Sequence, residues 1–254
     1  MLFGLSALVR PISLVFVVVV LVCARRARVA TWVAVGLFVL ATVVTIAPWT
    51  IRNRVSMRAF VPVSTNTGDD LCIGHHPHAS GGFGFPHSCV DAKESGRTVA
   101  AEISGDHYAT HEALRFAVAH PLAEVPLAAK RIWASIRNDS DSVAASEAYG
   151  DDVWMQAGLR RGLGIASNLF WWVLFAAALM GVVVVARARP RVPAQVVLLA
   201  PVALVLIPTV VFFGDPRFKT PGVPFLAILA AAALESVRAR RTPSLVEATL
   251  GGRG

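Results

Sequence analysis

Long apolar runs, separated by short charged stretches, dominate the pattern of hydrophobic and polar positions along this chain. A helix needs about 20 mostly apolar residues to cross the roughly 30 Å hydrocarbon core of a bilayer, and most of these runs reach or approach that length. We therefore expect a mainly α, polytopic transmembrane helix bundle with about five spans. The five runs are Leu2–Val22, Val29–Ala47, Ala166–Val185, Ala194–Phe213 and Pro221–Val237.

The first run is interrupted by Arg10 and Pro11. The part after this break, Ile12–Ala24, would rise only about 20 Å as a helix, which is too short to span. We therefore expect the first spanning helix to include residues before Arg10, with Arg10 near the outer edge of the bilayer. No basic segment precedes the run, so a signal peptide is a poor interpretation.

Three arginine clusters that follow apolar runs predict the orientation, because short loops rich in Lys and Arg stay in the cytoplasm. If every run spans once, all three clusters fall on the cytoplasmic side. The expected organisation is two spans in residues 1–47, an extracytoplasmic, α-rich loop subdomain in 48–165, three spans in 166–237 and a cytoplasmic tail in 238–254. The clusters are Arg25, Arg26 and Arg28; Arg187, Arg189 and Arg191; and Arg238, Arg240 and Arg241.

The charge balance agrees with a membrane protein. The 254-residue chain is 55% hydrophobic and 16% charged, with a formal net charge of +8. Residues 48–165 hold 11 of the 24 basic and 13 of the 16 acidic side chains, so the rest of the chain holds 13 basic and 3 acidic ones. The positive charge therefore gathers at the ends of apolar runs, which indicates membrane orientation rather than a nucleic-acid partner.

Within the predicted outer loop, residues 60–91 are rich in Gly, Pro, Ser and His, which indicates irregular structure or short strands. Residues 98–136 favour helix, broken at Pro121 and Pro126, and residues 151–161 favour a helix leading into the third span. Apolar side chains recur at helical spacing, which fits either a packed subdomain or amphipathic helices on the membrane surface. They are Leu114, Ala117, Val118, Ile132, Trp133 and Ile136.

Two cysteines, Cys72 and Cys89, lie in this loop, in a compartment where disulfides persist. Three states remain open: a disulfide, free thiols, or zinc bound with His75 and His87, although the spacing is not that of a standard finger. No metal site is assigned. Asp69 and Asp70 could bind a metal or act as a base, but two adjacent acids in a surface loop are more often simply solvated.

Several cations lie on the outer side, against the usual bias, so an anionic group should compensate them. The candidate is a lipid phosphate held by bidentate arginine contacts, and the alternative is ordinary contact with lipid headgroups. The candidate phosphate-binding residues are Arg10, Arg52, Arg54 and Arg217, with Arg58 and Lys219 nearby in sequence.

Ordered motifs along the chain resemble bacterial membrane glycosyltransferases of the GT-C superfamily, the protein mannosyltransferase-like and aminoarabinose transferase-like members of family 39 and its relatives. Each motif is weak alone, and the ordered set is more specific. The motifs are GLSALVRP at 4–11, APWTIRN at 47–53, FVPVSTNTG at 60–68, IGHHP at 73–77, ALR at 113–115 with His120, Pro121 and Lys130, and DPRF at 215–218 with Pro221 and Pro224.

The resemblance implies transfer of a sugar from a polyprenyl-phosphate-linked donor to an extracytoplasmic acceptor, by a multi-pass protein of the plasma membrane and cell envelope. The family's catalytic carboxylate lies in a first outer loop that no residue here matches, so no catalytic acid is assigned. We expect the chain to correspond to the C-terminal portion of such an enzyme. The alternatives are a non-catalytic accessory protein with a lipid-binding loop and, more weakly, a transporter. Neither a cofactor nor an oligomeric state is assigned from the sequence.

Overall fold

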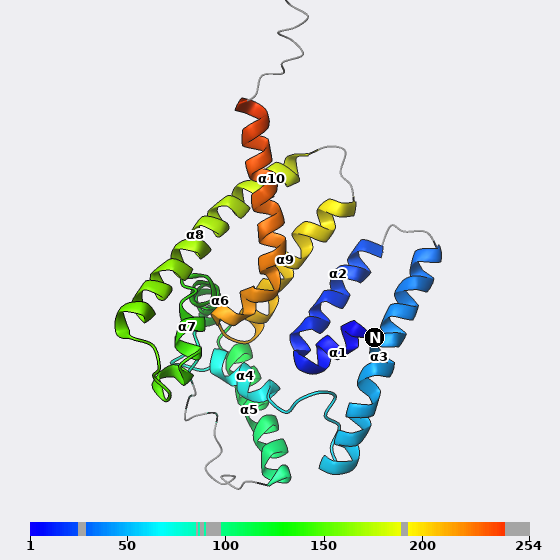
Figure 1. Ribbon diagram of the computed structural model, residues 1–254. Coiled ribbons are helices and arrows are strands. Elements are labelled where there is room, and N and C mark those ends of the chain that lie inside the picture. Colours follow the sequence, from blue (N-terminus) through cyan, green and yellow to red (C-terminus); the bar gives the residue numbers. More distant parts are fainter. Residues whose placement is uncertain (25–28, 85, 87–88, 90–97, 189–192, 242–254) are drawn as a thin grey trace, which may run out of the picture. The chain divides into compact units, whose positions relative to one another are not determined.

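The expectation of a mainly α protein is confirmed. The computed structural model describes residues 1–24, 29–84, 86, 89, 98–188 and 193–241 (Figure 1). Within these ranges there are helices and turns but no strand, and one isolated bridge joins Gly82 to Gly214. The helices are α1 (Leu2–Val9), η1 (Pro11–Leu14), α2 (Val15–Ala24), α3 (Val29–Met57), α4 (Thr67–Gly74), α5 (Val99–Ala119), α6 (Pro121–Ile136), α7 (Asp141–Ala145), η3 (Ala148–Gly150), α8 (Ala157–Arg187), α9 (Pro193–Val211), η4 (Pro216–Gly222) and α10 (Val223–Arg241).

The chain divides into two compact units. One comprises residues 1–137 and 203–220, and the other comprises residues 138–202 and 221–254. Five arginines of the predicted cytoplasmic clusters (25, 26, 28, 189 and 191), together with His87 and the tail from Thr242, lie outside the described residues.

The expectation that one helix runs through Arg10 is wrong. Helix α1 ends at Val9, and Arg10 adopts an extended conformation with φ −140° and ψ 101°. Pro11 causes this break, because its ring disfavours the helical conformation for the residue before it. The short α1 packs on α3 instead, with the rings of Phe3 and Phe38 5.0 Å apart.

Helix α3 extends past the predicted end of the second run at Ala47. It continues through Pro48 to Met57 and contains 29 residues. Thr42 and Thr45 each donate a side-chain hydrogen bond to the carbonyl four residues earlier, at 2.8 and 2.6 Å. These bonds satisfy the hydroxyls inside an apolar helix, where they would otherwise lack a partner.

Three helices among the described residues are long and apolar enough to cross a membrane. They are Thr31–Met57 with 27 residues, Ala157–Arg187 with 31 and Pro216–Arg238 with 23. Between 11% and 28% of their most apolar segments is buried inside the protein. Apolar helices with so little burial need an apolar surrounding, as a bilayer provides.

Between α3 and α8, the structure differs from the sequence expectation in two places. Residues 67–74, expected to be irregular or extended, form the helix α4. The predicted break at Pro121 is present, since α5 ends at Ala119 and Pro121 begins α6, where its missing N–H costs no hydrogen bond. Pro126, by contrast, lies inside α6 without breaking it.

Half of the apolar stripe expected on α5 and α6 is exposed, and the other half is partly buried. Leu114 and Val118 are exposed, whereas Ala109 and Ala113 on the other face of α5 are buried. These small side chains let α4 approach α5 closely, so Cys72 and Leu71 of α4 pack on them. The core of this region is therefore built from small residues.

In the other unit, α8 packs against α10 (Figure 1). A Cβ added at Gly181 of α8 would lie 1.9 Å from the carbonyl oxygen of Leu229 in α10. Helix α8 begins at Ala157, so residues 151–156, expected to be helical, are not part of it. Glu147, in the segment that precedes α8, is buried. Its Oε1 accepts hydrogen bonds from the backbone N–H groups of Trp154 and Met155 at 3.1 and 2.7 Å.

Candidate functional site

The turn between α9 and η4 carries an oriented arginine. The guanidinium of Arg217 donates two hydrogen bonds to Asp215, from Nε to Oδ1 at 2.9 Å and from Nη2 to Oδ2 at 2.7 Å. Asp215 is buried, while the Arg217 side chain is 52% exposed. A bidentate pair of this kind fixes the plane of the guanidinium. Arg217 is therefore a pre-oriented cation at a surface.

Helix α6 and the segment around Gly81 hold this turn in place. Ser135 Oγ accepts a hydrogen bond from the Asp215 N–H at 2.9 Å, and the ammonium of the buried Lys219 lies 3.4 Å from the Ser135 carbonyl oxygen. The Gly214 N–H donates to Gly81 O at 2.7 Å. Gly81 has φ +89°, a conformation that glycine adopts without steric cost. The turn is thus anchored by residues far away in sequence.

Asp70 lies within electrostatic reach of Arg217. Burial, followed by the charge of Asp69, raises the pKa of Asp70 to about 6, although Arg217 lowers it and Asp106 adds to the rise. Burial and Asp106 also raise the pKa of Asp69. Asp70 can therefore exchange a proton near neutral pH. Among the described residues no group of three His, Cys, Asp or Glu side chains is arranged to hold a metal ion.

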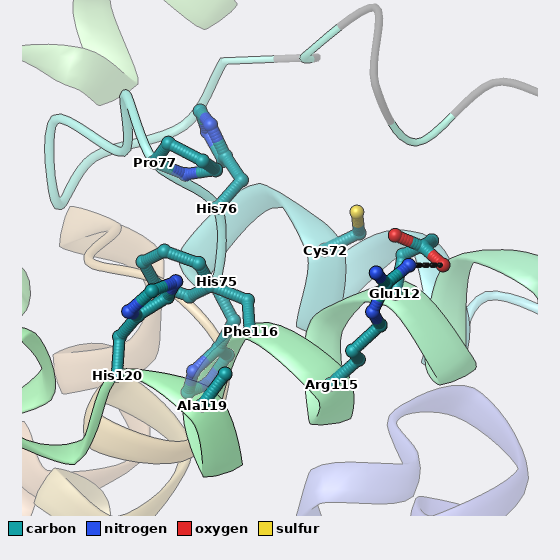
Figure 2. Close-up of a pocket in the computed structure, with 9 residues that line it drawn as sticks. All are labelled: Cys72, His75, His76, Pro77, Glu112, Arg115, Phe116, Ala119 and His120. Carbon is teal, nitrogen blue, oxygen red and sulfur yellow. Dashed lines mark ion pairs between the residues drawn. The ribbon is translucent and has the colours of Figure 1, made fainter.

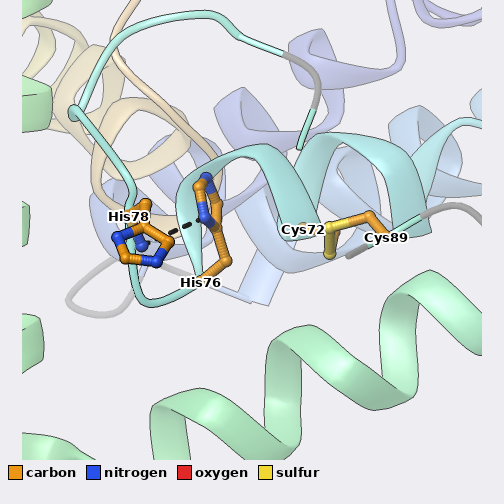
Figure 3. Close-up of a disulfide and its surroundings, with 4 residues drawn as sticks. All are labelled: Cys72, His76, His78 and Cys89. Carbon is orange, nitrogen blue, oxygen red and sulfur yellow. Dashed lines mark hydrogen bonds between the residues drawn. A yellow bond between two sulfur atoms is a disulfide. The ribbon is translucent and has the colours of Figure 1, made fainter. Parts of the chain in front are cut away.

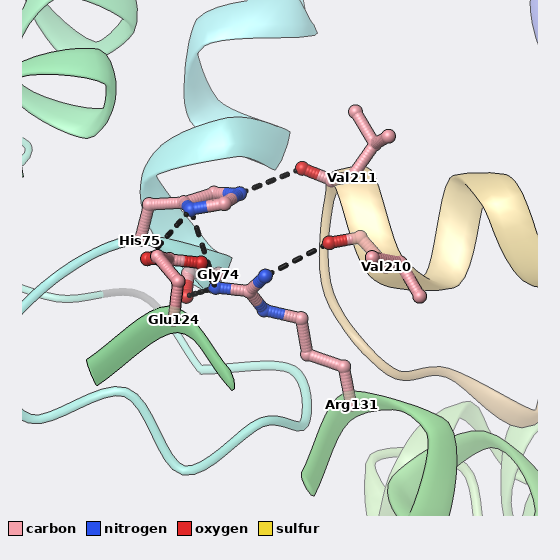
Figure 4. A network of polar contacts seen from close by, with 6 residues as sticks. All are labelled: Gly74, His75, Glu124, Arg131, Val210 and Val211. Atoms are coloured by element: carbon pink, nitrogen blue, oxygen red, sulfur yellow. Dashed lines mark hydrogen bonds and ion pairs between the residues drawn. The ribbon is translucent and has the colours of Figure 1, made fainter. Parts of the chain in front are cut away.

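A buried arginine in α6 ties three distant segments together (Figure 4). Arg131 is 1% exposed and donates to the carbonyl oxygens of Gly74 at 2.6 Å and Val210 at 2.8 Å. Its Nη2 also forms an ion pair with Glu124 Oε2 at 2.9 Å. The carbonyls belong to the C-terminal ends of α4 and α9, where helices leave backbone acceptors unpaired. Arg131 therefore caps two helices at once.

His75 completes this network. Its Nε2 lies 2.8 Å from Val211 O, which can only accept, so Nε2 carries a proton. Its Nδ1 lies 3.0 Å from Glu124 Oε1 and 3.2 Å from Arg131 Nη2. A neutral ring would accept from Arg131 at Nδ1, and a protonated ring would donate to Glu124. In either form, both ring nitrogens make hydrogen bonds within the protein.

Two of the other predicted phosphate-binding cations, Arg52 and Arg54, have local partners. Arg52 lies over the ring of Trp49, with its Cζ 5.1 Å from the ring centroid, and its Nη1 donates to Asn53 Oδ1 at 3.3 Å. Arg54 Nη1 donates to the Arg58 carbonyl at 3.3 Å. Arg10 is exposed at the end of α1. The convergence of these side chains with Arg217 on one phosphate stays a prediction.

Of the three states open for the loop cysteines, the structure adopts the disulfide between Cys72 and Cys89 (Figure 3). The Cα atoms are 6.0 Å apart, and both residues are buried against α5. Beside the disulfide, burial and the neighbouring His78 lower the pKa of His76. The His78 N–H donates to His76 Nδ1 at 3.3 Å, so this nitrogen accepts a hydrogen bond within the protein.

A pocket of about 360 Å³ lies between α4 and α5 (Figure 2). Its charged groups, Glu112 and Arg115, form an ion pair at 3.6 Å and so offset one another. His75, one of its three histidines, is already engaged in the Arg131 network. This pocket therefore does not single out a ligand.

The sequence pattern did not reveal the central roles of Arg131 and Ser135. Both lie on the buried face of α6, and the signal available was a charged residue at helical spacing from the apolar Leu127 and Ala134. A charged residue at this spacing is equally compatible with a solvated helix face. Only the contacts of α6 show that this face is buried.

Comparison of the chain with protein-family models, with curated proteins and with solved structures finds no match.

Proposed function

We propose that this chain is a multi-pass protein of the plasma membrane with about five crossing segments and a large extracytoplasmic loop between α3 and α8. The three helices long and apolar enough to span support this arrangement, and α9 with the broken first run would supply the other two segments. The arginine clusters of the sequence give the orientation, because short basic loops stay in the cytoplasm. In this arrangement the turn carrying Arg217 is extracytoplasmic.

Within that membrane protein, we propose that the chain forms the donor-binding portion of a glycosyltransferase that uses a polyprenyl-phosphate-linked sugar. The ordered resemblance of its motifs to such enzymes supports the substrate class. The observation that carries the proposal is the half-exposed Arg217, oriented by Asp215 at the start of a candidate membrane span. A phosphate at the lipid surface has the charge and the oxygen acceptors that a guanidinium pairs with.

The test is donor binding rather than sugar transfer, because no catalytic carboxylate is assigned. The full chain in detergent would be exposed to a photoreactive short-chain polyprenyl phosphate, and covalent labelling would be measured as a function of probe concentration. Each charge-assisted contact is worth about 1.5–3 kcal/mol, so Arg217→Ala and Arg52→Ala should each weaken binding roughly tenfold or more. Arg217→Lys should also weaken binding, because an ammonium cannot form two parallel hydrogen bonds.

Arg115→Ala is the matched control, since Arg115 is also an exposed arginine but lies on α5, where it pairs with Glu112. It should leave labelling unchanged. Equal labelling of the wild type, Arg217→Ala and Arg52→Ala would reject a shared phosphate site. Labelling that the uncharged polyprenol analogue matches would reject recognition of the phosphate.

A further inference from the structure

Helix α6 has its polar side chains inside and an apolar stripe outside. Glu124, Arg131 and Ser135, on its inner face, all take part in the hydrogen-bond networks described above. On the opposite face Leu122 is 87% exposed, Val125 70% and Trp133 55%. An amphipathic helix of a water-soluble protein has the reverse arrangement.

The exposed apolar positions lie on one line along the helix. Leu122, Val125, Ala129 and Trp133 are spaced by three or four residues, so they face the same side. Such a continuous stripe marks a surface that water does not cover. Trp133 adds a ring of the type enriched where a bilayer meets water.

The inner face of α6 is hydrogen-bonded to the C-terminal end of α9 and to the residue that directly precedes a candidate span. Arg131 binds the carbonyl of Val210 at the C-terminal end of α9, and Ser135 binds the N–H of Asp215. The next residue, Pro216, begins one of the three helices able to span a membrane. Helix α6 is thus hydrogen-bonded to the residue directly before a candidate span, and the first residue of a span that crosses a bilayer lies at the depth of the headgroups.

The charges on the exposed side of α6 are positive. Lys130 and Arg137, the residue after the helix, are both exposed and lie along one edge of the stripe, while the helix's acidic residue, Glu124, faces inward to Arg131. An apolar stripe bordered by cations fits an anionic lipid surface, because the side chains enter the upper acyl region and the cations meet lipid phosphates. A neutral protein partner would not account for these cations.

We propose that the outer face of α6 lies in the headgroup layer of an anionic bilayer, with its apolar stripe inserted and Lys130 and Arg137 at the lipid phosphates. The inference rests on the membrane placement proposed above, but not on the glycosyltransferase assignment. It gives α6 a second role besides anchoring the α9–η4 turn: it holds that turn against the lipid surface.

The test uses the full chain in lipid nanodiscs made from a three-to-one mixture of phosphatidylcholine and phosphatidylglycerol. Cys23 is replaced by Ala, the Cys72–Cys89 disulfide is left intact, and one environment-sensitive fluorophore is attached at Val125→Cys. A second variant, Ala129→Cys, guards against misfolding of the first. Quenching is compared between brominated lipids and an aqueous ion. His111→Cys, on an exposed polar position of α5, is the aqueous control, and Val44→Cys, exposed on α3, is the membrane control.

We expect the ratio of lipid quenching to aqueous quenching to be several-fold higher at residues 125 and 129 than at residue 111. Lys130→Glu should lower the ratio at residue 125 in anionic discs but not in discs of phosphatidylcholine alone. If the α3 label is quenched by lipid while residues 125 and 129 behave like residue 111, the placement of α6 is wrong and the membrane placement stands. If the α3 label is not quenched by lipid, both are wrong. Shielding of residues 125 and 129 from both quenchers would mean that protein, such as a second copy, covers the stripe, which also rejects the proposal.

Discussion

At the scale of single residues, the buried charges Arg131 and Glu147 are paired with opposite charges and hydrogen-bonded to other segments of the chain. Arg131 joins Glu124 and carbonyls 57 and 79 residues away. Buried Glu147 pairs with Arg160, whose hydrogen bond is the main reason that the pKa of Glu147 is lowered. A buried charge is costly unless it is paired and hydrogen-bonded. These residues therefore make folding conditional on bringing the right segments together.

Replacing Arg131 by Met should strongly destabilise the protein. The change removes the ion pair between Arg131 and Glu124 and the side-chain donor to two carbonyls, for a loss of about 3 kcal/mol in the free energy of unfolding. Unfolding in detergent, followed by circular dichroism, measures it. Lys130→Met, at the exposed neighbour, should change stability by about 0.5 kcal/mol or less. Adding Glu124→Gln to Arg131→Met should recover part of the loss, and no recovery would mean that the ion pair matters less than the carbonyl contacts.

Asp70 should make stability depend on pH in the weakly acidic range. Its pKa is raised from 3.8 to about 6, so between these values the folded state binds a proton that the unfolded state does not. The stabilisation from this proton is complete at low pH and is lost as pH rises through about 6. Asp70→Asn should therefore raise the thermal midpoint at pH 8 and change it little at pH 4. The exposed Asp152→Asn should alter neither, and an equal shift at both pH values would contradict the titration of Asp70.

At the scale of elements, close helix contacts depend on small residues. The approach of α8 to α10 at Gly181 leaves no space for a Cβ, and the contact between α4 and α5 uses Ala109 and Ala113. Small residues let helix backbones come together, which strengthens dispersion contacts between apolar helices in a membrane. The glycines along α8 therefore differ in the space available for a larger side chain.

Gly181→Ala should separate α8 from α10 and destabilise their contact, whereas Gly162→Ala should not. A methyl group at Gly181 meets the Leu229 backbone, but one at Gly162 meets nothing within 4 Å. We expect a loss of roughly 1–3 kcal/mol at Gly181 and a neutral effect or a gain of up to about 1 kcal/mol at Gly162, from helix propensity. Thermal unfolding of the detergent-solubilised variants provides the comparison. Similar effects at both positions would show that the close contact is absent.

The disulfide ties α4 to residue 89, 17 positions further along the chain. Mass spectrometry of a non-reduced digest should recover the linked peptides containing Cys72 and Cys89. Cys72→Ala should lower stability by about 3 kcal/mol, the value expected for closing a loop of this length. Free thiols at both positions in protein from an oxidising compartment would refute the pairing.

At the scale of the whole molecule, the proposed topology can be tested by accessibility. Residues 48–165 should be outside the cell and Arg187 inside, with Cys23 replaced by Ala and the disulfide left intact. A membrane-impermeant thiol reagent should therefore label Ser142→Cys in intact cells, and Arg187→Cys only after permeabilisation. The reverse labelling pattern would mean that the orientation is opposite to the one proposed. Labelling of both cysteines in intact cells would mean that α8 does not cross the membrane.

The apolar runs alone were enough to predict a mainly α protein, because the length and continuity of apolar segments are local properties of the chain. Pro121 likewise marked the start of α6. Local patterns gave a wrong prediction at Arg10, where the first run looked long enough for one helix. They were also wrong at residues 67–74, where a glycine and two acidic residues made a helical segment look irregular. The number of spans and the extracytoplasmic loop remain predictions.

Tertiary structure alone decided which face of each helix is inside. The periodicity of α6 reveals an apolar stripe, but not that the stripe faces outward while Arg131 and Ser135 face inward. That choice depends on carbonyls at the ends of α4 and α9 and on the Asp215 N–H, which lie 57 to 80 residues away. The same holds for Arg217, whose type and position were visible in the sequence, but whose orientation comes from a turn anchored by α6. Periodicity is set by neighbours along the chain, whereas the side of a helix that becomes buried is set by the partners that folding brings to it.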